Sequence, residues 1–165
     1  MRIDLDVAAP DQALAVAALR NAAASALTIR YGTGPWSLAT SERGVLFEMR
    51  RGTVYLATRH GKPLATLILS TRKPWAIDTT WFTACSHPLY LTAMTVDPDF
   101  QRTGVGRQCL EEAVSIAARW PSGGIRLDAW DAEVGAGGFY RKCGFREVGR
   151  AVYRQVPLIY FERII

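Results

Sequence analysis

The feature that most constrains the fold of this 165-residue chain is an apolar run that leads through a glycine-bearing loop into an amphipathic segment. The run from Leu89 to Val96 predicts a buried strand, which Asp97-Pro98-Asp99 ends. From Gly104 to Trp120 apolar residues recur at helical spacing, which predicts a helix. The first amides of a helix lack intrahelical partners and its dipole adds positive charge there, so the loop is suited to a phosphate group.

Two common phosphate-binding loops do not fit the segment Gln101-Arg102-Thr103-Gly104-Val105-Gly106. A Walker loop requires lysine and then serine or threonine after its last glycine, but Arg107 and Gln108 follow here. A dinucleotide fingerprint requires a third glycine, and Cys109 occupies that place. A loop that binds phosphate mainly through backbone amides therefore remains.

The N-terminal half predicts three strands and one long loop. Residues 3–7 alternate apolar and charged side chains, which indicates a short strand with one buried face. The apolar runs 54–58 and 64–69 are joined by His60-Gly61-Lys62-Pro63, which is typical of a hairpin. Residues 71–88 are irregular and rich in aromatic side chains, and long loops of this kind often border ligand sites.

Two helices are predicted in the same half. Residues 11–30 are rich in Ala and Leu, and Asp11 is placed to cap their start. The buried face of this helix is predicted to carry Leu14, Ala18 and Ala22. Residues 37–50 predict a second helix with Leu46 and Met49 facing inward.

After the glycine loop and its helix, the C-terminal part predicts a strand, a helix and two further strands. The strand covers residues 125–130, and the helix covers 133–143 with Gly144 as a left-handed cap. The last two strands cover 145–153 and 158–164. Strands mixed with helices in this order indicate an α+β fold.

Composition narrows the class of protein. With 49% hydrophobic and 21% charged residues, the chain predicts one packed domain over residues 1–165. It contains neither a bilayer-length apolar run nor a leader pattern, which predicts a cytoplasmic protein without a membrane partner. The scattered spacing of Cys85, Cys109 and Cys143 predicts free thiols rather than a disulfide framework or a metal site. The net charge of +5 is also scattered, which argues against nucleic acid and suits a polyanionic cofactor.

The glycine loop and its surroundings resemble the GNAT superfamily of acyl-CoA-dependent N-acyltransferases. The family signature Gln/Arg-x-x-Gly-x-Gly/Ala lies between a strand and a helix, and residues 101–106 match it. Met94-Thr95-Val96-Asp97-Pro98 is similar to the family's strand end. Gly138-Phe139-Tyr140-Arg141-Lys142-Cys143-Gly144-Phe145 resembles its Phe-Tyr-x-x-x-Gly-Phe segment. The close resemblance covers residues 89–150.

The resemblance implies a fold and a cosubstrate. The fold is a mixed, mostly antiparallel central sheet flanked by helices, in which a central parallel strand pair splays apart to hold acetyl-CoA. Main-chain groups of Met94, Thr95 and Val96 are expected to bind the pantetheine arm and polarise the thioester carbonyl. The pyrophosphate is expected on the loop, whose residues are Gln101, Arg102, Thr103, Gly104, Val105, Gly106 and Arg107.

The resemblance also implies two catalytic residues. Tyr140 matches the family's usual acid, and a phenol with a pKa of about 10 is protonated at neutral pH and can donate to a departing thiolate. A role as a core aromatic is the alternative. Asp128 falls where some members carry a carboxylate that accepts a proton. Alternation along its strand leaves open whether this carboxylate enters the cleft or contacts solvent.

One cofactor-binding position departs from the family pattern. Seven residues before Tyr140, many members carry an asparagine that contacts the cofactor, and this chain has Glu133. An ionised glutamate cannot donate that hydrogen bond. Capping of the following helix is therefore the favoured role of Glu133, and Asp131 is a substitute for the missing contact.

The implied function is an N-acetyltransferase that moves an acetyl group from acetyl-CoA to a primary amine by direct transfer in a ternary complex. A small-molecule acceptor is favoured, and aromatic and acidic side chains are the candidates to line its pocket. These candidates are Tyr31, Trp36, Glu48, Trp75, Trp81 and Tyr90, with His87 as an alternative base. A non-catalytic acyl-CoA-binding or regulatory domain and an acetyltransferase acting on protein or RNA stay open, and a homodimer is expected because many relatives dimerise.

Overall fold

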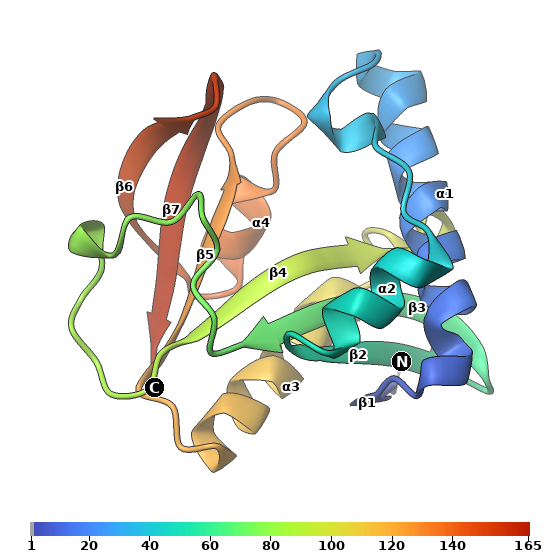
Figure 1. Ribbon diagram of the computed structural model, residues 1–165, viewed down its shortest axis with the longest axis horizontal. Coiled ribbons are helices and arrows are strands. Elements are labelled where there is room, and N and C mark those ends of the chain that lie inside the picture. The colour runs from blue at the N-terminus through green and yellow to red at the C-terminus, as the bar shows by residue number, and fades with distance from the viewer. Residues whose placement is uncertain (1) are drawn as a thin grey trace. The chain divides into compact units, whose positions relative to one another are not determined.

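Strands and helices alternate along much of the chain in the computed structural model, which describes residues 2–165 (Figure 1). The strands are β1 (Asp4–Val7), β2 (Thr53–Arg59), β3 (Lys62–Ser70), β4 (Leu89–Val96), β5 (Gly124–Trp130), β6 (Arg146–Tyr153) and β7 (Val156–Ile164). The helices are α1 (Ala13–Tyr31), α2 (Glu42–Met49), α3 (Val105–Arg119) and α4 (Gly137–Lys142). Short 3-10 turns are η1 (Pro10–Gln12), η2 (Pro35–Ser37), η3 (Thr79–Trp81) and η4 (Pro98–Phe100).

The strands form a seven-stranded sheet in the order β1-β2-β3-β4-β5-β7-β6. The pairs β1–β2, β2–β3, β5–β7 and β6–β7 are antiparallel, whereas β4 and β5 are parallel. This confirms the predicted α+β class with a mostly antiparallel sheet and one parallel pair. The chain divides into two compact units, of which the first holds residues 2–69 and 93–112 and the second holds 70–92 and 113–165.

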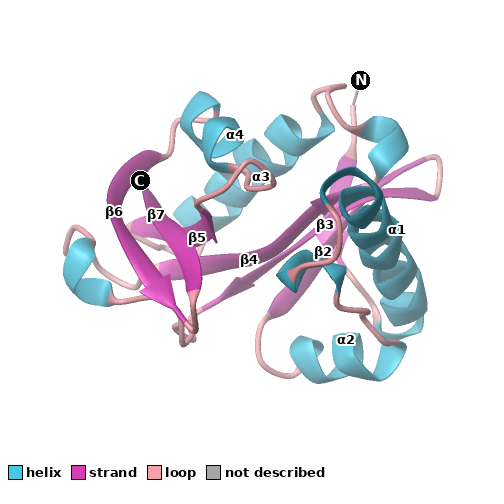
Figure 2. Ribbon diagram, turned by 90° about the horizontal axis from the view of Figure 1, so that it is seen from above, coloured by secondary structure: helices cyan, strands magenta, loops and turns pink. Residues whose placement is uncertain are grey.

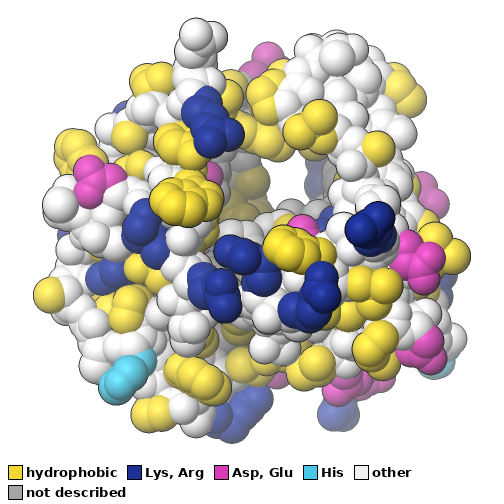
Figure 3. Space-filling view, viewed as in Figure 1, with side chains coloured by type: hydrophobic (Ala, Val, Ile, Leu, Met, Phe, Trp, Pro, Cys, Tyr) yellow, Lys and Arg dark blue, Asp and Glu magenta, His cyan; other side chains and the backbone are white. Residues whose placement is uncertain are grey.

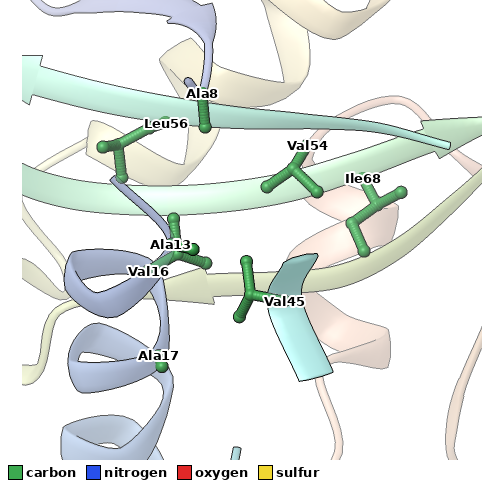
Figure 4. Close-up of a cluster of buried hydrophobic side chains, with 8 residues drawn as sticks. All are labelled: Ala8, Ala13, Val16, Ala17, Val45, Val54, Leu56 and Ile68. Atoms are coloured by element: carbon green, nitrogen blue, oxygen red, sulfur yellow. The ribbon is translucent and has the colours of Figure 1, made fainter. Parts of the chain in front are cut away.

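In the first unit, the predicted hairpin is confirmed as β2 and β3. His60 and Gly61 form its turn, and both have positive φ angles, 49° and 75°. The helices α1 and α2, drawn in Figure 2, both contribute to the core with β2 and β3. Figure 4 shows the core side chains, which are Ala8, Ala13, Val16, Ala17, Val45, Val54, Leu56 and Ile68.

The buried face of α1 differs from the predicted one. Leu14 is 62% exposed and Ala18 and Ala22 are exposed, whereas the next face of the helix packs into the core. The predicted cap is also wrong, because the N-cap is Gln12 and no side chain caps the helix. Alanine occupies so many positions of α1 that apolar periodicity contains little information on which face is buried.

The second helix, α2, is shorter than predicted and begins at Glu42. Ser41 is its N-cap, and the Ser41 hydroxyl accepts a hydrogen bond from the Gly44 amide at 3.0 Å. Val45 is fully buried and Met49 packs against the same core, which confirms the prediction for Met49. Leu46 was predicted to face inward, but 37% of it is exposed.

In the second unit, β5 pairs with β7 along its whole length, from Gly124 opposite Ile164 to Trp130 opposite Leu158. A hairpin joins β6 to β7 through Arg154 and Gln155, as the two predicted C-terminal strands require. The first residues of β4 also belong to this unit. Leu89 lies opposite Ile125 and Tyr90 opposite Arg126 in the parallel pair.

The helix α4 begins at Gly137, four residues later than predicted. Gly135 lowers the helix propensity of the segment 133–136 before it. Gly135 has a steric reason to be glycine, since a Cβ there would lie 1.9 Å from the Trp130 carbonyl oxygen. The N-cap of α4 is Ala136 without a side-chain hydrogen bond, so the predicted capping by Glu133 is wrong. Gly144 follows the helix with φ of 82°, as predicted.

Val45→Ala is expected to lower the free energy of unfolding by about 2 kcal/mol, because it removes two methyl groups from a fully buried site. Leu46→Ala, on the adjacent exposed position, is expected to change it by about 0.5 kcal/mol or less. Urea unfolding of both variants checks the assignment of the buried face of α2. A larger loss for Leu46→Ala than for Val45→Ala contradicts it.

Gly135→Ala is expected to destabilise the protein by about 2 kcal/mol or more, since the new Cβ overlaps the Trp130 carbonyl. Gly138→Ala is its matched control, because nothing lies within 4 Å of the added Cβ and alanine favours the helix by about 0.5–1 kcal/mol. Equilibrium denaturation measures both. Equal effects of the two substitutions would disprove the close approach at Gly135.

Candidate functional site

The predicted site residues divide between the two units. The glycine loop and the second half of β4 belong to the first unit, whereas Asp128, Glu133 and Tyr140 belong to the second. In each unit, local hydrogen bonds and packing fix where the side chains lie.

The glycine loop connects η4 to α3 and is exposed from Gln101 to Gly104. Gly104 has a φ angle of 92°, which favours glycine, and no atom lies within 4 Å of the position a Cβ would take. The helix starts one residue later at the fully buried Val105, and the Gln108 amide donates to the Gly104 carbonyl at 3.0 Å. Amides earlier in the first turn have no carbonyl four residues back in the helix, so the loop offers donors to an anion.

Side chains of the loop bond to its own backbone. The Thr103 hydroxyl donates to the Phe100 carbonyl at 2.6 Å, and the Gln101 side-chain amide donates to the Val96 carbonyl at 3.3 Å. The Asp97 amide in turn donates to the Leu64 carbonyl of β3 at 2.8 Å. These bonds fix the path of the loop relative to β3 and β4, and they give the side chains of Gln101 and Thr103 a structural role.

The strand segment Met94-Thr95-Val96 is half-buried. Ala93, directly before it, has a φ angle of 52°, which is uncommon for a residue other than glycine and interrupts the regular geometry of the strand. The Thr95 hydroxyl donates to the Ala93 carbonyl at 3.2 Å. A left-handed residue inside a strand changes the direction of the backbone groups that follow. Sequence reasoning missed this feature, because alanine gives no signal for a positive φ angle.

Tyr140 is a buried residue of α4, enclosed by aromatic rings. Its ring centroid lies 5.4 Å from that of Phe139, and 5.8 Å from those of Phe145 and Phe161. Burial, followed by the nearby Asp128 carboxylate, raises the pKa of the Tyr140 phenol above its ordinary value. The phenol is therefore protonated throughout the physiological pH range.

Asp128 lies on β5 opposite Tyr160 of β7, whereas its neighbour Leu127 lies opposite Phe161. Because alternate residues of a strand face opposite sides, Asp128 belongs to the face opposite the one on which Phe161 contacts Tyr140. The negative charge of Asp128 also raises the pKa of the Tyr140 phenol, after the larger effect of burial. Burial raises the pKa of the Asp128 carboxyl, and a hydrogen bond with its own backbone offsets part of the effect. Asp128 is thus a partly buried carboxylate rather than a solvated one.

Glu133 is exposed in the loop before α4. Asp131 was predicted to substitute for the cofactor contact that Glu133 cannot make. It forms an ion pair with Arg150, in which the Arg150 Nη1 lies 3.0 Å from one carboxylate oxygen. The Asp131 amide donates to the Pro157 carbonyl at 2.9 Å. These contacts give Asp131 a structural role at the start of the loop.

Sequence reasoning missed a polar network that holds the segment 71–88 on the sheet of the second unit. Glu162 is 1% exposed and accepts hydrogen bonds from the Thr83 amide and hydroxyl at 2.9 and 2.6 Å. Arg126, its cross-strand neighbour, donates to the Thr83 carbonyl at 2.9 Å and to the Tyr90 hydroxyl at 3.2 Å. Charged residues inside two apolar strands were the signal that could have indicated this network.

Tyr160 provides a second attachment of the same segment. Its hydroxyl donates to the Ala76 carbonyl and accepts a hydrogen bond from the Asp78 amide. Ile77, Phe82 and Tyr90 form a buried cluster with the Tyr160 ring. The segment 71–88 is therefore anchored at two places, beside the face that carries Asp128.

The acceptor candidates have different environments. Tyr90 is buried in the core, and Trp75 and Trp81 are 85% and 48% exposed on the anchored segment. In the first unit, Glu48 of α2 forms an ion pair of 2.5 Å with Arg20 of α1, a residue that the sequence pattern did not single out. The remaining two are half-buried: Tyr31 and Trp36.

The other groups considered as reactive lie outside these clusters. His87 is exposed and precedes β4, and His60 is a turn residue as predicted. The three cysteines are free thiols, and burial raises the pKa of Cys109 to about 12.

No helix within residues 2–165 is long and apolar enough to cross a membrane. Lys and Arg side chains are exposed at several separate places on the face shown in Figure 3.

Comparison with known sequences gives a family match and one curated relative. The model of the family described as Acetyltransferase (GNAT) family matches residues 17–145. Peptidyl-lysine N-acetyltransferase YjaB of Salmonella typhimurium is 31% identical over 62 residues, which is 38% of this chain. The matched segment spans 39% of the length of that relative.

Solved structures share the fold at low sequence identity. The ribosomal-protein-S18-alanine N-acetyltransferase of Escherichia coli has a TM-score of 0.71 at 18% identity, over 99% of this chain and 94% of that one. A GCN5-related N-acetyltransferase of Rhodopseudomonas palustris has a TM-score of 0.74 at 18% identity, over 100% and 97% of the two chains. An acetyltransferase of Bacillus anthracis in complex with acetyl coenzyme A has a TM-score of 0.55 at 23% identity, over 70% and 63%. The family match, together with a fold that these structures share, shows that the chain belongs to the acetyltransferase (GNAT) family.

Proposed function

We propose that this protein is an N-acetyltransferase that moves the acetyl group of acetyl-CoA to a primary amine of a small molecule, by direct transfer in a ternary complex. The observation that carries the proposal is the buried, protonated Tyr140 in the segment that matches the family's acid. The phenol is protonated at neutral pH and so holds the proton that a departing thiolate requires. The family match runs through segments of both units, which supports one acetyltransferase domain over residues 1–165.

The glycine loop is our candidate for the pyrophosphate of acetyl-CoA. Its exposed position and the open space at Gly104 fit a bulky anion. The first amides of α3 would supply most of the hydrogen bonds, since phosphate favours a helix N-terminus. The exposed Arg102 and Arg107 add positive charge there. The backbone of Met94, Thr95 and Val96 is our candidate for the pantetheine arm.

The chemistry needs two proton transfers. As the amine nitrogen forms its bond to the acetyl carbon, it loses a proton, and we assign Asp128, which lies on the other face of β5 from the Tyr140 contact, as the acceptor through water. As the carbon–sulfur bond breaks, the departing thiolate takes a proton from the Tyr140 hydroxyl. Burial of Asp128 makes its carboxylate a stronger base than a solvated aspartate. In this scheme the exposed Glu133 takes part in neither proton transfer.

We favour a small acceptor, and the segment that joins α1 to α2, which carries the candidate Trp36, is a candidate to border it. Two sets of hydrogen bonds close this segment, between Thr28 and Ser37 at 2.6 Å and between Asn21 and the Thr40 backbone at 2.7 and 2.9 Å. Peptide amines belong in the acceptor panel nevertheless, because the relatives include enzymes named for lysine and alanine acceptors.

Tyr140→Phe is expected to lower kcat about 100-fold or more, since it removes the acid and keeps the ring packing. The measurement is thiol release from acetyl-CoA with a panel of amines, at unchanged protein stability. Tyr153→Phe, at a half-buried position of β6, is the control and is expected to keep full activity. If the wild type binds acetyl-CoA and acetylates no amine in the panel, the enzymatic proposal fails.

Asp128→Asn is expected to lower activity and raise stability together. The raised pKa means that the folded state holds the carboxyl proton more tightly than the unfolded state, so stability falls as pH rises through the folded pKa. The neutral amide removes this cost at pH 7, and it also removes the base. In the wild type, activity is expected to fall with decreasing pH at a pH above the ordinary aspartate range. Urea unfolding at pH 7 and a pH–rate profile of both proteins test this, and a fully active Asp128→Asn variant refutes the role.

A further inference from the structure

Tyr160 is the residue of β7 that lies directly opposite Asp128 in the antiparallel pair of β5 and β7. Side chains that oppose each other in this way lie on the same face of the sheet, with Cβ atoms about 4.5–5.5 Å apart. Burial raises the pKa of the Tyr160 phenol, and the negative charge of Asp128 adds to the rise. Tyr160 is therefore the neighbour of the candidate base on β7.

The Tyr160 hydroxyl holds the segment 71–88 at this place. It donates to the Ala76 carbonyl and accepts a hydrogen bond from the Asp78 amide at 3.3 Å. Ile77, which lies between these two residues, is 2% exposed in the cluster that contains the Tyr160 ring. The ring centroid of Phe82 lies 5.5 Å from that of Tyr160. The segment thus meets the sheet through one phenol hydroxyl and the apolar side chains around it.

The segment also covers this face of the sheet on either side of Tyr160. A Cβ at Gly149, the residue of β6 opposite Tyr160, would lie 2.5 Å from the Trp81 ring, so this ring rests on the strand. Two residues further along β7, Glu162 accepts hydrogen bonds from Thr83. The segment therefore runs across the face that carries the candidate base, which is itself half-buried.

The charged and titratable groups around this place are bonded to other parts of the protein. They are Tyr90, which accepts from Arg126, Glu162, which accepts from Arg146, and Lys73 and Asp78 of the segment, which bond to Ile77 and Thr80. Burial is the largest cause of the raised pKa of the Asp128 carboxyl. Removal of the Tyr160 hydroxyl leaves every one of these charges in place, so it changes the cover of the carboxyl and not its charged neighbours.

We propose that Tyr160 is a positioning residue for Asp128, because its hydroxyl holds the segment 71–88 over the carboxylate and keeps bulk water away from it. This inference rests on the proposed N-acetyltransferase function, in which Asp128 is the base, and adds a residue that acts through that base. A carboxylate with less hydration binds a proton more tightly. Tyr160 thus strengthens the base without taking up a proton itself.

Tyr160→Phe tests the inference, since it keeps the ring and removes only the hydroxyl. The Asp78 amide loses its acceptor, so its hydrogen exchange is expected to become about 10-fold faster. The pKa of the Asp128 carboxyl is expected to fall toward the ordinary aspartate value, because more water reaches it. Carbon-13 NMR of the purified full chain with labelled aspartate carboxyls measures this titration, and the spectrum of Asp128→Asn identifies the resonance.

Tyr90→Phe is the matched control. It removes another phenol hydroxyl of the same buried cluster, one that accepts from Arg126 at 3.2 Å. This variant is expected to be less stable than the wild type and to leave the Asp128 titration in place. The inference is wrong if Tyr160→Phe does not move the Asp128 titration, or if Tyr90→Phe moves it as far.

Ile77→Ala is the second variant, in case Tyr160→Phe does not fold. It loosens the segment between the two residues that bond to Tyr160, and it keeps every polar group. The pKa of the Asp128 carboxyl is expected to move in the same direction as in Tyr160→Phe. An Asp128 titration that stays unchanged in Ile77→Ala overturns the inference as well.

The pH–rate profile of acetyl transfer separates this inference from the proposed function. With Asp128 as the base, activity falls as the pH decreases through its folded pKa, and Tyr160→Phe is expected to move this fall to lower pH. A shift of the NMR titration without a shift of the rate profile supports the positioning and counts against Asp128 as the base. Absence of turnover with every amine counts against the proposed function, and the NMR titration then decides the inference by itself.

Discussion

The antiparallel register between β5 and β7 decides where each candidate catalytic group of the second unit lies. Leu127 opposite Phe161 forms the face that packs against Tyr140, and Asp128 opposite Tyr160 forms the other face. Arg126 and Glu162, one pair further along, hold the segment 71–88. A slip of one residue in this register would exchange the faces and separate the acid from its aromatic shell.

Much of the fold could be predicted from the sequence, because strands and turns depend on local patterns. The strand 89–96 was predicted with its observed bounds, and the hairpin at His60 and Gly61 followed from its turn residues. The helix α1 shows the limit. Its many alanines make all faces similar, and only the packing of Val16 and Ala17 against the sheet selects one.

The candidate site was predictable where it depends on backbone and not where it depends on distant partners. The glycine loop has a local signature, and Gly104 has the backbone conformation that glycine favours. The pair of Arg20 and Glu48 joins residues 28 positions apart, and the attachment of Thr83 to Glu162 joins residues 79 apart. Such pairs arise from the tertiary fold, so no window of sequence contains them.

Because several of the hydrogen bonds that hold the segment 71–88 go to its backbone, its exposed side chains can change while the segment stays attached. Tyr160 bonds to main-chain atoms of Ala76 and Asp78, and Arg126 bonds to the main chain of Thr83. These bonds to the main chain do not depend on the side chains of the segment, whereas the bond from the Thr83 hydroxyl to Glu162 does. Exposed positions such as Trp75 can therefore be exchanged while the path of the chain persists. The segment combines a backbone path fixed by hydrogen bonds with exposed positions that can be exchanged, which makes it a suitable place for designed sequence variation.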